Sequence, residues 1–130
     1  MSNVDISIII VSWNVRELLR ANLRRLFSVP TKLRYEVFVV DNGSHDGSAY
    51  MVRSEFPEVK LITNAWDAGF AGPNNQALRL AKGDVCLLLN PDMLVEEGAL
   101  DATHEKLMQD KTVGVLGIKL IGQDGKPINS

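Results

Sequence analysis

The feature that most constrains the fold is a regular alternation of short apolar runs with longer amphipathic stretches. The first run, Ile6–Val11, is rich in β-branched residues and lacks the polar alternation of a half-exposed strand, so we expect helices to cover both of its faces. Further strands are predicted at Glu36–Val40, Val59–Ile62, Val85–Leu89 and Val113–Leu116. A chain that alternates strands with helices forms a mostly parallel sheet. The sequence therefore predicts an α/β protein with a Rossmann-like, three-layer α/β/α architecture.

The stretches between these runs carry the signals of helices. Apolar residues of the first helix recur at helical spacing, and they are Val15, Leu18, Leu19, Leu23 and Leu26, with Pro30 beyond the helix end. A second helix is predicted at Asp46–Glu55. A third is predicted at Pro73–Ala81, because a proline lies in its first turn and Gly83 follows its end. In the fourth helix, Glu96 and Glu97 are placed in the first turn, where acids suit the helix dipole.

The end of the sequence departs from this alternation. The turn-forming residues 123–126 lie between Leu120–Ile121 and Pro127–Ile128, which predicts a hairpin. The length of 130 residues suits one domain, residues 1–130, with no room for a second.

Composition excludes several classes of protein. The 14 basic and 16 acidic residues give a pI of about 5.6, so no basic field is present to attract nucleic acid. The longest apolar runs, about five residues, are far shorter than a membrane span. The single cysteine, Cys86, lies in an apolar run, so we expect it in the core. A cytoplasmic location is expected, with membrane association only through further sequence.

Polar residues follow three of the predicted strands at the point where each strand ends. These segments are Ser12-Trp13-Asn14, Asp41-Asn42 and Asn90-Pro91-Asp92. Ligands of open α/β sheets bind beyond the carboxyl ends of the strands, so the three segments predict one cleft. An aromatic ring, carboxylates and amides together suit a nucleotide and a divalent cation held by oxygen ligands.

The same segments resemble the family-2 glycosyltransferases. Ile8–Asn14 is similar to the opening strand of that family, and Val39–Ser48 to its nucleotide-binding turn. Asn64–Ala77 resembles the segment that contacts the nucleotide sugar, and Gly83–Asp92 occupies the place of the Asp-x-Asp metal motif. Within the family, the Asn-Pro-Asp form looks most like rhamnosyltransferase-type members.

The resemblance implies a glycosyltransferase A-type fold and a metal-dependent, inverting transfer of sugar. The donor would be a nucleoside-diphosphate sugar, the acceptor a saccharide or lipid-linked saccharide of cell-surface polysaccharide synthesis, and the cation Mg²⁺ or Mn²⁺. Asp92 would hold the metal alone, since Asn90 replaces the first carboxylate, and Asp41 would accept a hydrogen bond from the base. The implied nucleotide-binding residues are Ser12, Trp13, Asn14, Asp41, Asn42, Asn64, Gly69, Asn74 and Asn90.

Several of these residues also have an ordinary structural interpretation. Asp41 can form an Asx turn before Gly43, and Asp92 can be a turn residue after Pro91. Asp46 suits a helix N-cap whether or not it contacts nucleotide, and Asn74, like its neighbour Asn75, can satisfy local backbone. His45 and His104 have no partner at metal-ligand spacing, so we expect both at the surface.

No catalytic base can be assigned from the sequence. An inverting transfer needs a group that takes the proton from the acceptor hydroxyl, and none of the acids after Asp92 matches the base motif of the family: Glu96, Glu97, Asp101, Glu105, Asp110 and Asp124. We therefore expect a truncated domain whose exposed sheet edge favours self-association. A non-catalytic domain that only binds nucleotide sugar is the alternative.

Two other classes fit less well. A nucleotidylyltransferase needs a glycine-rich, basic loop after the first strand, where this chain has Trp13-Asn14-Val15. A receiver-like module needs an acid at the same place.

Overall fold

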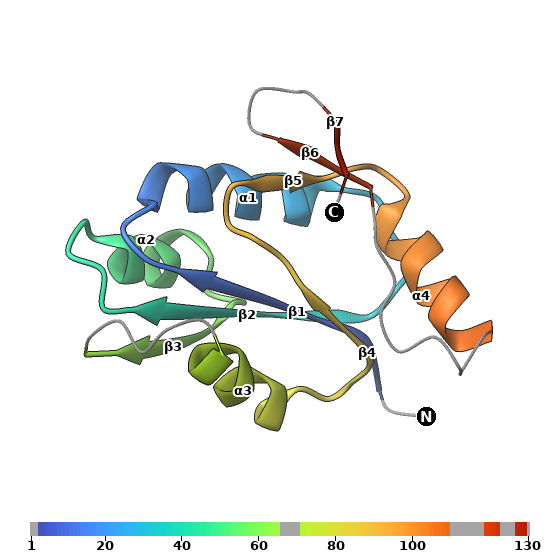
Figure 1. The fold of residues 1–130 in the computed structure, drawn as a ribbon, viewed down its shortest axis with the longest axis horizontal. Coiled ribbons are helices and arrows are strands. Elements are labelled where there is room, and N and C mark those ends of the chain that lie inside the picture. The colour runs from blue at the N-terminus through green and yellow to red at the C-terminus, as the bar shows by residue number, and fades with distance from the viewer. Residues whose placement is uncertain (1–2, 66–70, 110–118, 123–126, 130) are drawn as a thin grey trace.

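The computed structural model describes residues 3–65, 71–109, 119–122 and 127–129, which form two sheets and four helices. The main sheet is parallel with strand order β3-β2-β1-β4 (Figure 1). Its strands are β1 (Val4–Ser12), β2 (Tyr35–Asn42), β3 (Lys60–Asn64) and β4 (Gly83–Leu88). Each overlaps a strand predicted from the apolar runs, so those four predictions are confirmed.

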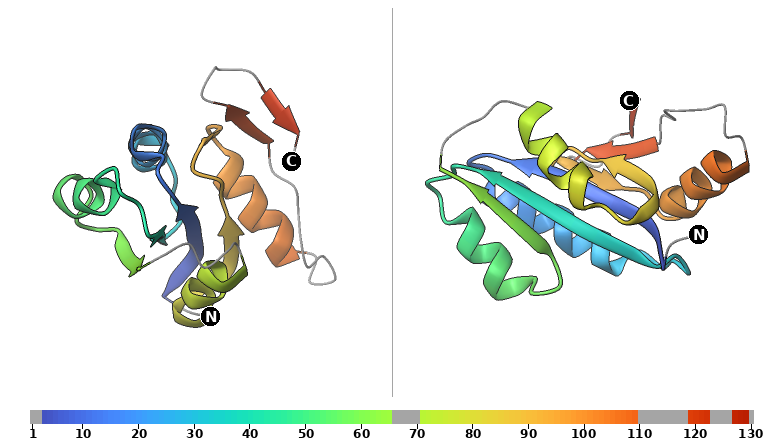
Figure 2. Two further views of the ribbon diagram at one scale, coloured as in Figure 1. Left: turned by 60° about the vertical axis from the view of Figure 1, so that its left-hand side comes forward. Right: turned by 90° about the horizontal axis from the view of Figure 1, so that it is seen from below.

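Helices cover both faces of this sheet (Figure 2). Their bounds are α1 (Arg16–Ser28), α2 (Ser48–Glu55), α3 (Ala71–Leu80) and α4 (Ala99–Gln109). The larger core cluster joins α1, α2 and α4 to one face of the strands, through residues such as Leu19, Met51 and Leu100. On the other face, Ala77 of α3 packs with Ile9 and Phe38. The three-layer α/β/α prediction is therefore confirmed.

The outer strand β4 is buried on one face alone. Val85 and Leu87 are buried, whereas Cys86 and Leu88 are exposed, Leu88 by 48%. The register pairs Cys86 with Ser7 and Leu88 with Ile9, which places both on the face that α3 packs against. The prediction of Cys86 as a core residue was wrong, because the described residues cover that face of β4 only in part.

Two helices begin later than predicted, and in each case a glycine explains the delay. Gly47 and Gly98 both have φ of 85°, a left-handed conformation that a right-handed helix cannot include. Consequently α2 starts at Ser48 and α4 starts at Ala99. Glu96 and Glu97 precede α4, so their prediction within its first turn was wrong.

A second, antiparallel sheet has the order β5-β6-β7. Its strands are β5 (Met93–Val95), β6 (Lys119–Gly122) and β7 (Pro127–Asn129). Strands β6 and β7 confirm the two arms of the predicted hairpin, while β5 had no prediction. The predicted strand at Val113–Leu116 and the hairpin turn lie outside the described residues. No described helix is long and apolar enough to cross a membrane.

Candidate functional site

The carboxyl ends of the parallel strands bring the predicted polar residues to one edge of the sheet. Ser12 at the end of β1 lies opposite Asp41 near the end of β2, and Asn42 lies opposite Asn64 at the end of β3. Just after β4, the Leu89 N–H donates to the Ile9 carbonyl at 2.9 Å, which keeps the following Asn90 beside β1. We call this edge the carboxyl rim.

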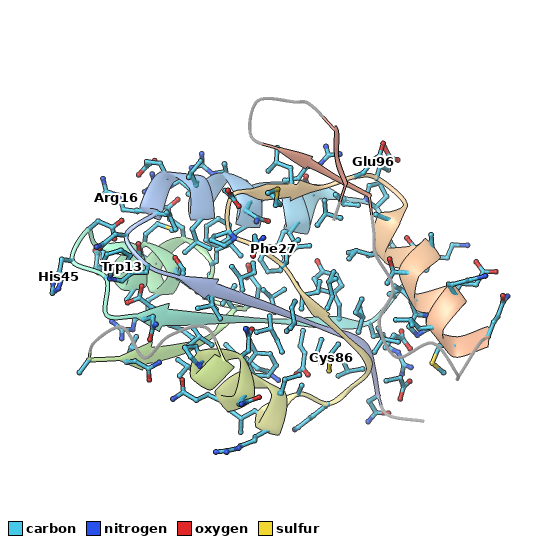
Figure 3. The ribbon with its side chains drawn as sticks, in the orientation of Figure 1. Trp13, Arg16, Phe27, His45, Cys86 and Glu96 are labelled. Carbon is cyan, nitrogen blue, oxygen red and sulfur yellow. The ribbon has the colours of Figure 1, made fainter. Side chains whose placement is uncertain are left out.

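The loops after β1 and β2 are joined directly to each other at this rim. Asn14 adopts a left-handed φ of 51°, its N–H donates to Ser44 Oγ at 2.9 Å, and its Oδ1 accepts from the His45 N–H at 2.7 Å. Figure 3 shows Trp13, Arg16 and His45 together at this end of the molecule. Trp13 is 52% exposed, so its ring is accessible for stacking on a base.

Asp46 reinforces the same junction. One carboxylate oxygen accepts from the Arg16 N–H at 2.9 Å, and the other accepts from the N–H and the hydroxyl of Ser48. Burial by itself would raise the pKa of Asp46, but these hydrogen bonds together hold that pKa below its ordinary value. Both oxygens are thus used within the fold, which favours the capping interpretation of Asp46.

Asp41 is the buried acid of the rim, with an exposed fraction of only 4%. Its Oδ2 accepts from the N–H of Ser44, three residues on, at 3.2 Å, so this oxygen supports the turn after β2, although not as an Asx turn, which would bond the N–H two residues on. Its Oδ1 is buried without a hydrogen-bond partner among the described residues, and so is Ser12 Oγ. Buried polar atoms are normally hydrogen-bonded, so these two atoms are candidate contacts for a ligand.

A chain of side-chain amides fixes the next part of the rim. Asn64 Nδ2 donates to Asn42 Oδ1 at 3.3 Å and to Gln76 Oε1 at 2.9 Å, and Gln76 Nε2 donates back to Asn64 Oδ1 at 3.0 Å. Gln76 lies on α3 and was not predicted as a site residue. Asn74, also on α3, is 5% exposed. The predicted residue Gly69 lies outside the described residues.

Asn90 and Asp92 belong to a tight turn between β4 and β5. The Met93 N–H donates to the Asn90 carbonyl at 3.2 Å and closes the turn. Asn22 of α1, which the sequence interpretation overlooked, donates to the carbonyls of both Asn90 and Pro91. The only signal for it was one amide among the leucines of the first helix. Both Asn90 and Asp92 are exposed.

The turn is chemically suited to a divalent cation. The Asp92 carboxylate and the Asn90 amide oxygen are hard ligands of the kind that Mg²⁺ and Mn²⁺ take, and their exposure leaves room for water and phosphate ligands. A single carboxylate is compatible with a cation that arrives with a diphosphate.

A hollow of about 340 Å³ lies beside α1 and is lined by residues that include Asn14, Arg16 and Asp46. It meets the rim at Asn14 and Asp46, but neither Asp41 nor Asp92 lines it.

At the opposite edge of the sheet, His104 departs from the prediction of a surface residue. It is half-buried, and its Nε2 is buried without a hydrogen-bond partner among the described residues. One ligand atom each from His104, Asp5 and Asp84 lie within 4.8 Å of one another. Arg34 donates to both oxygens of Asp5, so a protein cation already occupies this cluster and we assign no metal to it. His45 is exposed, as predicted.

Comparison with known proteins gives a consistent result. The model of the family "Glycosyl transferase family 2" matches residues 7–129. The uncharacterized glycosyltransferase YfnE of Bacillus subtilis is 36% identical over 107 residues, which are 81% of this chain and 27% of that protein. The Escherichia coli UDP-Glc:alpha-D-GlcNAc-diphosphoundecaprenol beta-1,3-glucosyltransferase WfgD is 32% identical over 94 residues, 71% of this chain and 36% of that protein.

Solved structures agree with this fold. The mannosyltransferase PcManGT from Pyrobaculum calidifontis, in complex with GDP-Man and Mn²⁺, has a TM-score of 0.75 and 28% identity, and the match covers 85% of this chain and 34% of that one. Staphylococcus aureus TarS in complex with UDP-GlcNAc has a TM-score of 0.71 and 23% identity, with 81% and 31% covered, which supports the fold alone.

The chain spans about a quarter to a third of the length of the relatives YfnE and WfgD. The glycosyltransferase A-type fold expected from the sequence is confirmed by the parallel sheet and by the structural matches. Because the family model matches nearly the whole chain, the protein belongs to the family-2 glycosyltransferases.

Proposed function

We propose that the carboxyl rim binds a nucleoside-diphosphate sugar, and that the chain serves an enzyme that transfers the sugar to an acceptor hydroxyl. The transfer is proposed to be inverting and dependent on Mg²⁺ or Mn²⁺. The observation that carries the proposal is the Asp41 Oδ1 atom, which is buried at the rim without a partner among the described residues.

A nucleotide base supplies what this oxygen lacks. Leaving a buried acceptor unsatisfied costs about 1–3 kcal/mol, and uracil, thymine and guanine all present ring N–H donors. The Ser12 hydroxyl, buried on the neighbouring strand without a partner among the described residues, offers a second polar contact. Trp13, exposed at the same rim, provides an aromatic surface on which the base can stack.

Asp92 and Asn90 are the residues proposed to hold the cation. A bound divalent cation would neutralise charge on the departing nucleoside diphosphate. The role of the protein is to present Asp92 at a fixed place, and the turn closed by Met93 serves this purpose.

The acceptor is proposed to be a saccharide or lipid-linked saccharide. The name of the relative WfgD supports this, because it gives alpha-D-GlcNAc-diphosphoundecaprenol as the acceptor of that protein. A rhamnosyl donor and a cytoplasmic location stay predictions. Transfer of sugar and binding alone can be distinguished by incubating the chain with radiolabelled donors and acceptors, since a purely binding domain forms no product.

The test is a thermal-shift panel of UDP, dTDP and GDP, each with and without Mn²⁺ or Mg²⁺. A ligand at a hundred times its dissociation constant stabilises the folded state by about 2.7 kcal/mol, which for this size raises Tm by roughly 8–15 °C. We expect such a shift with one nucleotide, larger with metal, and weaker in Asp41→Asn and Asp92→Asn.

The matched control is Glu58→Gln, which removes one negative charge from an exposed residue before β3, at the opposite edge of the sheet. Its shift should equal that of the wild type. If no nucleotide at millimolar concentration raises the Tm of the wild type, the rim is not a donor site and the proposal is wrong.

A further inference from the structure

We propose that Asn22 is a positioning residue, whose side-chain amide sets the place of the Asn90-Pro91-Asp92 turn and thereby of the Asp92 carboxylate. This inference rests on the proposed function, because Asp92 matters only if the rim binds a metal-nucleotide. Asn22 lies on α1 and contacts the turn from within the core, so it touches neither metal nor nucleotide.

The contacts between Asn22 and the turn are direct. Asn22 is completely buried, and its Nδ2 lies 3.0 Å from the carbonyl oxygen of Asn90 and 3.1 Å from that of Pro91. A single NH₂ group with two hydrogens therefore holds two successive carbonyls. With both carbonyls bound to a buried group, this part of the turn is anchored on α1 while Asp92 remains exposed.

The turn is also fixed on both sides of this anchor. Before it, the Leu89 N–H donates to the Ile9 carbonyl of β1, and after it the Met93 N–H donates to the Asn90 carbonyl. Asn22 supplies the link between the turn and α1, through the two residues immediately preceding Asp92. Groups that orient metal ligands in this way change metal affinity about 10- to 100-fold when they are lost.

The amide at this position satisfies two carbonyls of the turn but also carries a cost. Asn22 lies on the buried stripe of α1, with Leu19, Leu23 and Leu26. Its Oδ1 is buried without a partner among the described residues, which costs free energy. The reversed amide would place that oxygen against two carbonyl oxygens, so the contacts fix the orientation.

Arg25, one turn further along α1, provides a matched control. Its Nε donates to the carbonyl of Val95 in β5 at 3.0 Å, so it also joins α1 to the backbone of this segment, but three residues beyond Asp92. Substitution of either residue removes a contact between α1 and the segment. Only the loss of Asn22 acts on the turn itself.

The experiment compares Asn22→Leu and Arg25→Met with the wild type in the full chain. Mn²⁺ binding is titrated by electron paramagnetic resonance in the presence of saturating UDP or GDP, and nucleotide affinity is measured separately without metal. For Asn22→Leu we expect roughly tenfold weaker Mn²⁺ binding and an unchanged metal-free nucleotide affinity. For Arg25→Met we expect both to match the wild type.

A second readout does not depend on any ligand. Exchange of the Met93 amide hydrogen, followed by NMR, should be about fivefold faster in Asn22→Leu, because both hydrogen bonds from Asn22 are lost, at a net cost to the turn of about 1 kcal/mol. In Arg25→Met it should be unchanged. If leucine prevents folding, the smaller Asn22→Ser is measured in the same way with the same expected results.

The outcomes separate this inference from the proposed function. If the wild type binds no Mn²⁺ with any nucleotide, the proposed function fails and the positioning role fails with it. If the wild type binds but folded Asn22→Leu matches Arg25→Met in Mn²⁺ affinity, only the positioning role is overturned.

Discussion

Strand β2 carries two buried carboxylates, one near each end, and they differ in the number of hydrogen bonds that they accept. Glu36, near the start of the strand, accepts hydrogen bonds from Ser7 Oγ and Lys60 Nζ, both at 2.6 Å, and from the Lys82 N–H at 2.7 Å. Among the described residues, Asp41, near the end, accepts only the Ser44 N–H and retains a buried oxygen without a partner. The two are 8% and 4% exposed, so burial does not explain the difference.

The difference separates a group whose hydrogen bonds hold the fold from one that we propose contacts a ligand. The donors to Glu36 come from β1, from β3 and from the residue before β4, so this carboxylate ties the four strands together. In the part of the chain that the structure describes, Asp41 accepts a hydrogen bond only from the turn that follows β2. The sequence shows an acid in both places, and only the number of internal donors distinguishes their roles.

The largest effect is expected from Glu36→Ala. Removing a buried, hydrogen-bonded carboxylate leaves Ser7 and the Lys82 N–H without their acceptor, and we expect the free energy of unfolding to fall by about 3 kcal/mol. Urea denaturation measures this. Asp41→Asn is the control and should change stability by less than about 1 kcal/mol; equal losses in both variants would remove the contrast between the two acids.

For Asp41→Asn we expect a loss of nucleotide affinity rather than a loss of stability. A hydrogen bond to a charged group contributes about 1.5–3 kcal/mol, so the affinity for the preferred nucleotide should fall roughly 10- to 100-fold. Isothermal titration calorimetry gives the value, with Glu36→Gln as the partner variant at the other end of β2. An affinity equal to that of the wild type would show that Asp41 does not contact the ligand.

Gly83→Ala tests how closely the strands approach at the Glu36 end. A Cβ at this position would lie 2.5 Å from the Ser7 backbone nitrogen, so we expect a loss of about 1–3 kcal/mol from overpacking. Gly72→Ala is the control, since a Cβ there meets nothing within 4 Å. Because Gly72 lies in α3, that change should stabilise by about 0.5–1 kcal/mol. Nucleotide binding should survive in both folded variants.

The smallest effect concerns acid stability. Burial would raise the pKa of Glu36, but the hydrogen bonds from Lys60, Ser7 and the Lys82 N–H outweigh it and lower that pKa. A carboxyl with a depressed folded-state pKa stabilises the protein above its unfolded pKa, about 4.3, and this contribution is lost as pH falls further. Between about pH 5 and pH 3, Tm should therefore fall less in Glu36→Gln than in the wild type.

The parts of the fold that follow from local pattern were predictable, and the parts set by neighbours were not. The apolar runs predicted the strands β1 to β4, and a proline in the first turn helped to predict α3. The exposure of Cys86 was missed, because an uninterrupted run of apolar residues does not show whether each face of its strand is covered. The three-residue strand β5 depends on β6 for its pairing, so it has little local signal.

The residues of the candidate site also fall into two groups, those that the local sequence pattern predicts and those that it does not. Ser12, Asp41 and Asn90 follow strands and could be selected from the sequence alone. Asn22 and Gln76 contribute through contacts across 68 and 12 residues of sequence, respectively, from helices whose pattern gives no reason to select them. Residues that support a site from another element become visible only in three dimensions.

The position of Asp46 has a consequence for the charge of any bound diphosphate. Helix N-termini carry a partial positive charge that many nucleotide-binding folds direct at phosphate. Here the carboxylate of Asp46 accepts from the first N–H groups of both α1 and α2, so one internal anion neutralises both helix ends. Both helix ends are then less available to balance a diphosphate. This is an electrostatic reason to expect that a nucleotide bound at the rim arrives with its own cation.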